Sequence, residues 1–286
     1  MKIIDGKKIA GEITQEIGAE ISALGGKGPG LAFILVGENP ASQSYVRAKK
    51  KACGVTGIRS VLLEFAASMK ESELIAQIEQ LNRDPLIDGI LVQLPLPDSI
   101  DEKRVMLAID PRKDVDGFHP LNVGKMLLGD ESGHLPCTPL GIKVLLERSG
   151  IGVEGKHVVI VGRSNIVGKP LAAILMQKKR GANATVTVCH SRSQGLAEIT
   201  RSADILVAAV GSAGFIGPKM IKPGAIVIDV GIHRKEGKLV GDVDFENVLP
   251  IAGRITPVPG GVGPMTIAML LNNTLQSFKM NLSRNS

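Results

Sequence analysis

The chain has 286 residues, of which 44% are hydrophobic and 22% charged, and this composition excludes a disordered chain and predicts two globular domains. With no Trp, one Tyr and six Phe, the protein lacks the aromatic platforms on which nucleic-acid binders stack bases. The formal net charge of +6 leaves three alternatives, which are nucleic-acid binding, binding of anionic small molecules, or a merely basic surface.

The sequence carries no signal for export, for a membrane or for a metal. The N-terminal residues have no apolar segment before charges return, and the weakly polar run over 204–219 is too short and too rich in glycine to span a bilayer. The three cysteines are far apart and form no C-x-x-C pair, which fits neither a disulfide framework nor a zinc site. We therefore expect a cytoplasmic protein.

Helices and strands alternate in the first half of the chain. Apolar residues at helical spacing predict helices over 9–24 and 74–81, the second preceded by a capping box formed by Ser68 and Glu71. A third helix is predicted within 38–57. Short apolar runs predict strands that are buried on both faces, over 31–37, 61–65 and 89–94.

The second half repeats this alternation and ends in one more helix. Strands are predicted at 157–162, 184–190, 203–211 and 224–231, with helices near 169–180, 193–202 and 265–278. This order is typical of right-handed βαβ units and a parallel sheet. We expect two α/β domains, 1–138 plus 265–286 and a Rossmann-like domain over 139–264, with a cleft between them where ligands bind.

The segment VVIVGRSNIVGKP (158–170) predicts a strand, a turn and a helix. It is not a Walker A motif, because five residues separate Gly162 from Gly168 and Pro170 follows the lysine. Nor does it match G-x-G-x-x-G, since Ser164 replaces the second glycine. The turn can still present phosphates to backbone N–H groups at a helix N-terminus. The alternative is an ordinary turn between a strand and a helix.

The end of the next strand indicates which dinucleotide binds there. NAD-binding units usually place Asp or Glu at this point to hold the ribose 2′-hydroxyl, whereas a 2′-phosphate needs cations and hydroxyls. Here the strand ends in His190, Ser191 and Arg192, and Arg163 in the first turn adds a cation. These residues favour NADP over NAD.

Polar residues at three places are candidates for chemistry. Ser42, Tyr45 and Lys49 are spaced by three and four and share one helix face, although that face could instead be a solvated basic surface. Gln93 ends a buried strand, either as a site group or as a satisfied amide. Asp116, in an acidic turn with Asp114, either recognises a polar ligand or caps the turn.

These segments together resemble the short bifunctional form of the methylenetetrahydrofolate dehydrogenase/cyclohydrolase family. The motifs cover nearly the whole chain in family order, and they read SYVRAK (44–49), GILVQLPLP (89–97), KDVDGF (113–118), CTPLG (137–141), VGRSNIVGKP (161–170), CHSRS (189–193) and PGGVGPMTIAMLLNNT (259–274).

The resemblance implies two consecutive reactions at one site between the domains. Methylenetetrahydrofolate is oxidised to methenyltetrahydrofolate with NADP, and the product is hydrolysed to 10-formyltetrahydrofolate. It implies that Lys49 is the catalytic lysine, Gln93 its hydrogen-bond partner, Tyr45 the ring that packs on folate and Asp116 the group that grips the pterin. It also implies a homodimer, with tetrahydrofolate derivatives and NADP as partners and no nucleic acid.

Further positions are assigned to the two ligands on the same motifs. The substrate contacts would include Ser42, Pro259, Gly260 and Gly261, whose glycines allow a flat ligand to approach the backbone closely. The cofactor positions are Gly162, Arg163, Ser164, Ile166, Gly168, Ser191, Arg192 and Ile232.

The residue types fit the two reactions. Loss of hydride from the methylene bridge is driven by neighbouring nitrogen lone pairs, so the first step needs orientation. Hydrolysis needs a group that moves protons near neutral pH, a task that suits a lysine where burial and nearby cations, here Arg47 and Lys50, lower its pKa. The alternative function is a non-catalytic NADP-binding regulator, and it would not need the set formed by Tyr45, Lys49, Gln93 and Asp116.

Overall fold

The computed structural model describes residues 2–26 and 28–285, with side chains described as far as Ser283. The chain divides into two compact units. One unit comprises Gly11–Cys137 and the residues from Ile267 onward, and the other comprises Thr138–Thr266 with the N-terminal residues up to Ala10.

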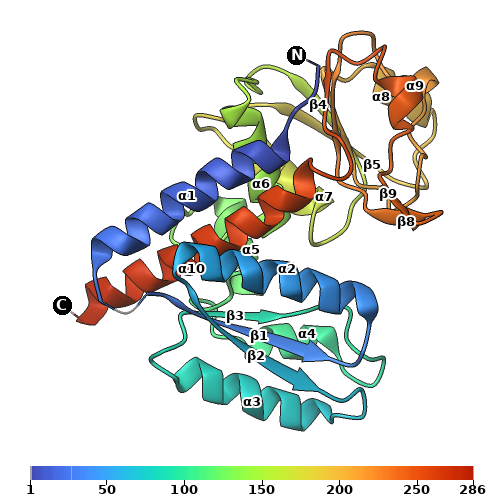
Figure 1. The fold of residues 1–286 in the computed structure, drawn as a ribbon. Helices are drawn as coiled ribbons and strands as arrows, with labels where there is room; N and C mark the ends of the chain where they lie inside the picture. The colour runs from blue at the N-terminus through green and yellow to red at the C-terminus, as the bar shows by residue number, and fades with distance from the viewer. Residues whose placement is uncertain (1, 27, 286) are drawn as a thin grey trace. The chain divides into compact units, whose positions relative to one another are not determined.

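The unit that begins at Gly11 has a three-stranded parallel sheet in the order β2-β1-β3. Its strands are β1 (Gly30–Val36), β2 (Arg59–Phe65) and β3 (Gly89–Val92). Figure 1 shows α2 and α3 on opposite faces of this sheet. The helices of this unit, some of which extend beyond it, are α1 (Gly6–Leu24), α2 (Pro40–Thr56), α3 (Glu71–Arg83), α4 (Glu102–Ala108), α5 (Pro120–Leu128) and α10 (Val262–Asn285).

Successive side chains of β1 point to opposite faces of the sheet. Ala32, Ile34 and Val36 point to one face, where they pack with Leu74 and Ile78 of α3. Strand β1 is buried throughout because β2 and β3 pair with it on both sides. Strand β2 lies at the edge and alternates between exposed and half-buried residues, so the expectation that 61–65 is buried on both faces was wrong.

Helix α2 has strong signals at both ends. The Asn39 side chain accepts hydrogen bonds from the backbone N–H groups of Ala41 (3.0 Å) and Ser42 (3.1 Å), and Pro40 occupies the first turn, where its missing N–H costs nothing. The helix ends at Gly57, whose φ of 80° is the left-handed conformation that glycine adopts readily. These signals set the bounds of α2, on which Ser42 and Lys49 are buried.

The start of α3 differs from the prediction. A turn in which the Met69 N–H donates to Ala66 O (3.0 Å) occupies the predicted cap, and the helix begins at Glu71. The Glu73 side chain accepts from the Lys70 N–H (3.3 Å). The capping box at Ser68 and Glu71 was therefore wrong, because the helix starts after this turn rather than before it.

The other unit contains a five-stranded parallel sheet in the order β10-β7-β6-β4-β5. The strand order reverses next to β4, so the topological switch point, where such sheets bind ligands, lies between β4 and β6. The elements are α6 (Cys137–Arg148), β4 (His157–Val161), α7 (Gly168–Leu175), β5 (Thr185–Cys189), α8 (Leu196–Arg201), β6 (Ile205–Ala208), η1 (Pro218–Met220), β7 (Ile226–Asp229), β8 (His233–Lys235), β9 (Lys238–Val240), α9 (Phe245–Val248) and β10 (Arg254–Ile255).

The two units, each with a parallel sheet covered by helices, confirm the predicted α/β class and the Rossmann-like second sheet. The N-terminal residues up to Ala10 differ from the expected boundary, because they belong to the unit of the five-stranded sheet. There Ile3 pairs with Ile255, and two backbone hydrogen bonds of 2.8 Å join Ile4 N to Ile255 O and Ile255 N to Lys2 O. None of the described helices is both long and apolar enough to cross a membrane.

Candidate active site

The unit of the three-stranded sheet holds a cluster of polar side chains centred on Lys49. The side chain of Lys49 is only 5% exposed, and its Nζ donates to Gln93 Oε1 at 3.1 Å. The same Nζ lies 4.9 Å from the centre of the Tyr45 ring, within cation–π range. Ser42, one turn before Tyr45, is also buried, and its Oγ donates to Leu94 O (3.4 Å). The helix spacing therefore places Ser42, Tyr45 and Lys49 on one face of α2, as predicted, and Gln93 meets Lys49 from the end of β3.

The orientation of the Gln93 amide is fixed by its other contacts. Gln93 follows β3, and its backbone N–H donates to Ile34 O (2.9 Å) in the pattern of the sheet. Its Nε2 donates to Leu94 O at 2.8 Å. Because the amide nitrogen is used in this way, the oxygen faces Lys49 and holds the ammonium in one place.

The structure separates the two acids of the turn that follows α4. Asp114 accepts hydrogen bonds from the backbone N–H groups of Phe118 (3.2 Å) and His119 (2.8 Å) and from Asn122 Nδ2 (2.9 Å). Asp114 therefore caps the turn.

Asp116, in contrast, lies near the Cys137 thiol, which donates to the preceding carbonyl, Val115 O (3.2 Å). Burial raises the pKa of the Asp116 carboxyl, the Lys49 ammonium opposes this rise, and the negative charge of Asp114 adds to it. The Asp116 carboxyl takes no part in the hydrogen bonds of the turn and lies near the buried Lys49 ammonium. It is therefore suited to binding a ligand.

Burial disfavours the thiolate form of both cysteines in this unit. Burial raises the pKa of Cys53 to about 12, although Lys49 lowers it in part. Burial also raises the pKa of Cys137 well above its usual value, and the charge of Asp116 acts in the same direction. Over residues 2–26 and 28–285, no group of three or more His, Cys, Asp or Glu side chains could hold a metal ion.

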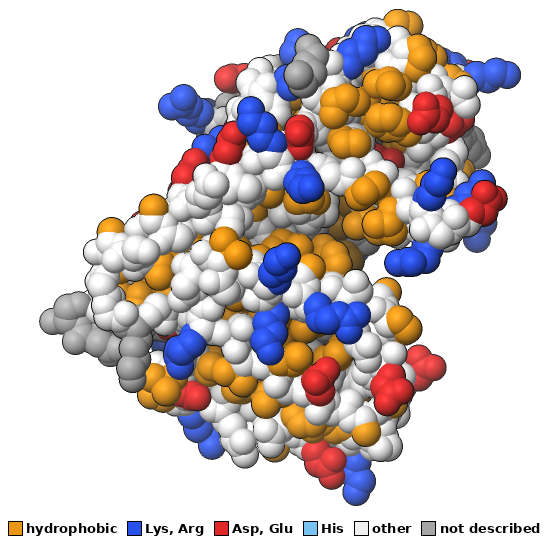
Figure 2. All heavy atoms as spheres, viewed as in Figure 1, with side chains coloured by type: hydrophobic (Ala, Val, Ile, Leu, Met, Phe, Trp, Pro, Cys, Tyr) orange, Lys and Arg blue, Asp and Glu red, His pale blue; other side chains and the backbone are white. Residues whose placement is uncertain are grey.

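Basic side chains gather on the outer face of α2. Figure 2 shows Lys and Arg atoms over this helix, and Arg47, Lys50 and Lys51 are exposed there. The positive charge thus lies on the same helix as Lys49 and attracts anionic ligands to it.

In the other unit, the predicted phosphate-binding turn is compact because two positions accept only glycine. Gly162, at the end of β4, has a φ of 135°, and a Cβ there would lie 2.0 Å from Ala209 O. A Cβ on Gly168, the first residue of α7, would lie 2.1 Å from Gly162 O. The Ser164 Oγ accepts from Val167 N at 3.1 Å. These contacts place the helix N-terminus directly against the strand end, which is the geometry that binds phosphate.

The cations predicted to hold a 2′-phosphate lie at the ends of adjacent strands. Arg163 follows β4 while Ser191 and Arg192 follow β5, and all three are exposed. The Arg192 N–H donates to His190 Nδ1 (3.1 Å), which fixes the turn after β5. Two other predicted cofactor residues, Ile166 (45% exposed) and Ile232 (51%), present apolar surface to solvent.

The glycines of the predicted substrate loop have a role within the protein itself. Gly260 has a φ of 104°, and its carbonyl accepts from the Lys7 N–H (2.8 Å). A Cβ on Gly6 would lie 1.9 Å from Gly261 O. The close approach at this loop is therefore made by the start of α1, so ligand binding is not needed to explain these glycines.

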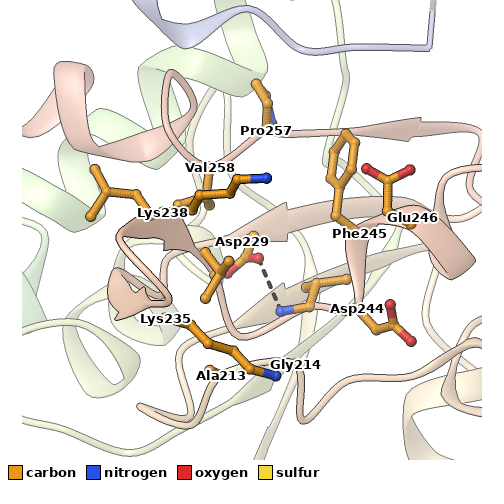
Figure 3. Close-up of a pocket in the computed structure, with 14 residues that line it drawn as sticks. Ala213, Gly214, Asp229, Lys235, Lys238, Asp244, Phe245, Glu246, Pro257 and Val258 are labelled. Carbon is orange, nitrogen blue, oxygen red and sulfur yellow. Dashed lines mark hydrogen bonds between the residues drawn. The ribbon is translucent and has the colours of Figure 1, made fainter.

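A cavity of about 670 Å³ opens at the carboxyl ends of β6, β7 and β10 (Figure 3). Asp229, which closes β7, accepts hydrogen bonds from the N–H groups of Gly231, Asp242 and Val243 (2.9–3.0 Å). Burial raises the pKa of Asp229 to about 6, and these hydrogen bonds act in the opposite direction. The residues that line this cavity do not include the predicted cofactor positions.

Two buried residues that support the cluster around Lys49 were not predicted from the sequence. The Cys137 thiol donates to Val115 O (3.2 Å), and Asn273 of α10 donates to the same carbonyl (2.9 Å), directly before Asp116. Both lie in motifs quoted for the family resemblance, CTPLG and PGGVGPMTIAMLLNNT, which is the one signal that could have identified them.

Comparison with known proteins gives matches over nearly the whole chain. Residues 4–116 match the catalytic domain of tetrahydrofolate dehydrogenase/cyclohydrolase, and residues 136–282 match the NAD(P)-binding domain of the same family. The bifunctional protein FolD of Prosthecochloris aestuarii is 56% identical over 289 residues, covering 97% of this chain and 98% of the relative. The bifunctional protein FolD of Bacillus subtilis is 57% identical over 284 residues, covering 98% and 99%.

Solved structures give the same result. The crystal structure of the bifunctional enzyme FolD from Campylobacter jejuni is 50% identical with a TM-score of 0.93, covering 98% of this chain and 99% of that one. The Trypanosoma brucei dehydrogenase-cyclohydrolase, solved with NADP cofactor and an inhibitor, is 40% identical with a TM-score of 0.92, covering 98% of each chain.

Proposed function

Because the chain belongs to the tetrahydrofolate dehydrogenase/cyclohydrolase family, we propose that Lys49 and the side chains around it carry both of the family's reactions. The protein is a bifunctional methylenetetrahydrofolate dehydrogenase and methenyltetrahydrofolate cyclohydrolase of folate one-carbon metabolism, and NADP is its cofactor. The observation that carries the proposal for Lys49 is its buried Nζ, 3.1 Å from Gln93 Oε1 and 4.9 Å from the Tyr45 ring centre.

We assign folate chemistry to the unit of Gly11–Cys137 and cofactor binding to the unit of Thr138–Thr266. The second assignment fits the dinucleotide because Gly162 and Gly168 leave no room for a Cβ at the phosphate-binding turn. Exposed Arg163, Ser191 and Arg192 supply the cations and hydroxyl that a 2′-phosphate needs. Ser164, Ile166 and Ile232 complete the proposed cofactor contacts.

In the dehydrogenase step, bound NADP supplies the hydride acceptor. The protein's task is orientation, because the ring nitrogens of the folate stabilise the cation that forms. Tyr45 packs against the folate ring, the Asp116 carboxylate accepts N–H groups at the pterin edge, and Ser42 supports the start of the same helix face. Pro259, Gly260 and Gly261 remain proposed substrate contacts on the strength of the family motif.

In the cyclohydrolase step, Lys49 Nζ as the free amine accepts the proton that the attacking water loses, and the ammonium formed in this way then gives a proton to the departing ring nitrogen. Gln93 Oε1 keeps Nζ at one position, and the Tyr45 ring stabilises its positive charge. The hydrolysis therefore depends on the ability of the Lys49 amino group to accept and release a proton, whereas the oxidation depends mainly on the folate being held in place.

This difference gives the test. Lys49→Gln should lower the cyclohydrolase rate by roughly 10²–10⁴-fold, which is the usual value of general acid–base catalysis, and should lower the dehydrogenase rate less. Methenyltetrahydrofolate would then accumulate and be measured by its absorbance. If the ratio of cyclohydrolase to dehydrogenase rates stays the same or rises in the variant, Lys49 is not the proton shuttle.

The resemblance further supports a homodimer as the active form. Light scattering of the purified protein at micromolar concentration should give twice the mass of 30.1 kDa calculated for one chain, and a monomer mass would contradict this part of the proposal.

A further inference from the structure

Asn273 is a buried polar residue of α10 that neither proposed reaction step uses. Its side chain is 1% exposed, and its Nδ2 donates to Val115 O (2.9 Å) and to Leu135 O (3.0 Å). Both hydrogens of the amide are thus satisfied. Its Oδ1 is buried and has no hydrogen-bond partner within the described part of the chain.

The orientation of this amide follows from its surroundings. Turning it over would place Oδ1 against two carbonyl oxygens, so the nitrogen must face Val115 and Leu135. Two neutral hydrogen bonds stabilise a fold by about 0.5–1.5 kcal/mol each, whereas a buried acceptor without a partner costs about 1–3 kcal/mol. These contributions nearly cancel, so stability alone does not explain an asparagine here.

The two carbonyl groups belong to the segments that carry Asp116 and Cys137, and the Cys137 thiol also donates to Val115 O (3.2 Å). Val115 directly precedes Asp116, and Leu135 lies two residues before Cys137. The segments also touch at Gly117, whose φ is 74° and where a Cβ would lie 2.5 Å from Leu135 C. The amide of Asn273 therefore joins the turn and the neighbouring segment at the point from which the Asp116 side chain extends.

Asp116 depends on this backbone for its position. Asp114 is fixed by the N–H groups of its own turn, whereas the Cys137 thiol near Asp116 is a weak hydrogen-bond donor and donates to Val115 O (3.2 Å). The position of the Asp116 carboxyl is therefore set by the backbone on either side of it, and Asn273 holds one of the neighbouring peptide groups.

We infer that Asn273 is a positioning residue that fixes Asp116 for folate binding. The inference rests on the proposed role of Asp116 as the group that grips the pterin. Asn273 does not touch the substrate in this view. It selects the geometry in which the Asp116 carboxylate accepts two N–H groups of a planar heterocycle together, which requires closer positioning than a single hydrogen bond.

The test compares Asn273→Ala with Ser277→Ala, a matched control one turn later on α10. Ser277 is also 1% exposed, its Oγ donates to Arg112 O (2.9 Å), and it lies 2.8 Å from His134 Nε2. Ser277 thus joins the same helix to the same two segments, but its contact in the turn is Arg112 and not Val115, the residue next to Asp116. A purely structural role would make the two variants alike.

We expect both variants to melt at lower temperature, while only Asn273→Ala raises the KM for methylenetetrahydrofolate, by about tenfold, which corresponds to about 1.4 kcal/mol. The KM for NADP should stay at the parent value, and kcat at saturating folate should change little. Asn273→Ser, which keeps one donor and is the more conservative change, should give an intermediate KM. It serves as the main variant if the alanine variant does not fold.

Asp116→Ala separates the possible results. If Asn273 acts through Asp116, adding Asn273→Ala to Asp116→Ala should raise the folate KM no further. If Asp116→Ala raises this KM while Asn273→Ala and Asn273→Ser leave it unchanged, or if Ser277→Ala raises it equally, the inference about Asn273 is wrong and the proposed site stands. If Asp116→Ala itself leaves the KM unchanged, the proposed role of Asp116 fails and the inference fails with it.

Discussion

The phosphate-binding turn allows a sharp test, because Gly168→Ala adds one methyl group at the position where β4 meets α7. The new Cβ would lie 2.1 Å from Gly162 O and 2.7 Å from Gly162 C. Both neighbours belong to the backbone, and Gly162 N is itself bonded to Cys189 O at 2.8 Å. The first turn of α7 would have to move by about 1 Å to restore ordinary contact distances.

The size of the effect follows from two opposing contributions. Overpacking of this kind costs about 1–3 kcal/mol, while replacing a helical glycine with alanine gains up to about 1 kcal/mol. We therefore expect a net loss of about 1–2 kcal/mol, or a fall in melting temperature of roughly 2–8 °C. Because the movement opens the turn that holds the phosphates, the affinity for NADP should fall by about tenfold.

Gly124→Ala is the control, since Gly124 lies inside α5 and a Cβ there meets no atom within 4 Å. This variant should keep its NADP affinity and melt at the same or a slightly higher temperature. Calorimetric titration with NADP and thermal melts with and without NADP measure both quantities. A Gly168→Ala protein that binds NADP and melts as the parent does would refute the close contact and its assigned role.

Four further results are expected. Arg163→Gln should weaken NADP binding far more than NAD binding, and equal catalytic efficiency of the parent protein with both cofactors would contradict the assigned 2′-phosphate contacts. Asp116→Ala should lower both activities because it weakens folate binding, and it should leave NADP affinity nearly unchanged. Near-normal folate binding in this variant would mean that Asp116 does not bind the folate. The double variant of Lys49→Gln and Gln93→Leu should lose less activity, in free energy, than the sum of the single losses, because the two side chains share one hydrogen bond; additive losses would contradict this coupling. The pKa of Asp229 is raised from 3.8 to about 6 in the folded protein, so the folded state binds this proton more tightly than the unfolded state does. The contribution of Asp229 to stability is therefore full below pH 4 and is lost as the pH rises through 6. Thermal melts between pH 4 and 7 should show this decline, and a curve for Asp229→Asn parallel to that of the parent would contradict it.

Local patterns predicted the elements that repeat with a clear period. The helices around Ile13 and Leu74 and the strands β1, β3, β4 and β6 follow directly from apolar spacing. Burial of β2 was predicted incorrectly because an apolar run does not show whether a strand lies at the edge of its sheet. The short β8–β9 hairpin and α9 carry too few residues to show any period and were not predicted.

The candidate site also has one part that local sequence patterns predict and one part that they do not. Ser42, Tyr45 and Lys49 lie on one helix, so their spacing alone places them together. The different environments of Asp114 and Asp116 depend on which neighbours fold over the turn, and the bond from Asn273 to Val115 joins residues 158 positions apart. No local pattern contains that information, because it arises only when α10 packs against the turn.

The pairing of Ile3 with Ile255 has a consequence for how the chain is made. The two residues are about 250 positions apart, so the first strand-like segment to leave the ribosome waits for its partner until synthesis is nearly complete, roughly 10–50 seconds at ordinary rates. Until then β10 does not exist, and afterwards it offers an open edge until the N-terminal residues pair with it. Residues fused ahead of Lys2 would therefore act on the last step of sheet formation rather than on the first.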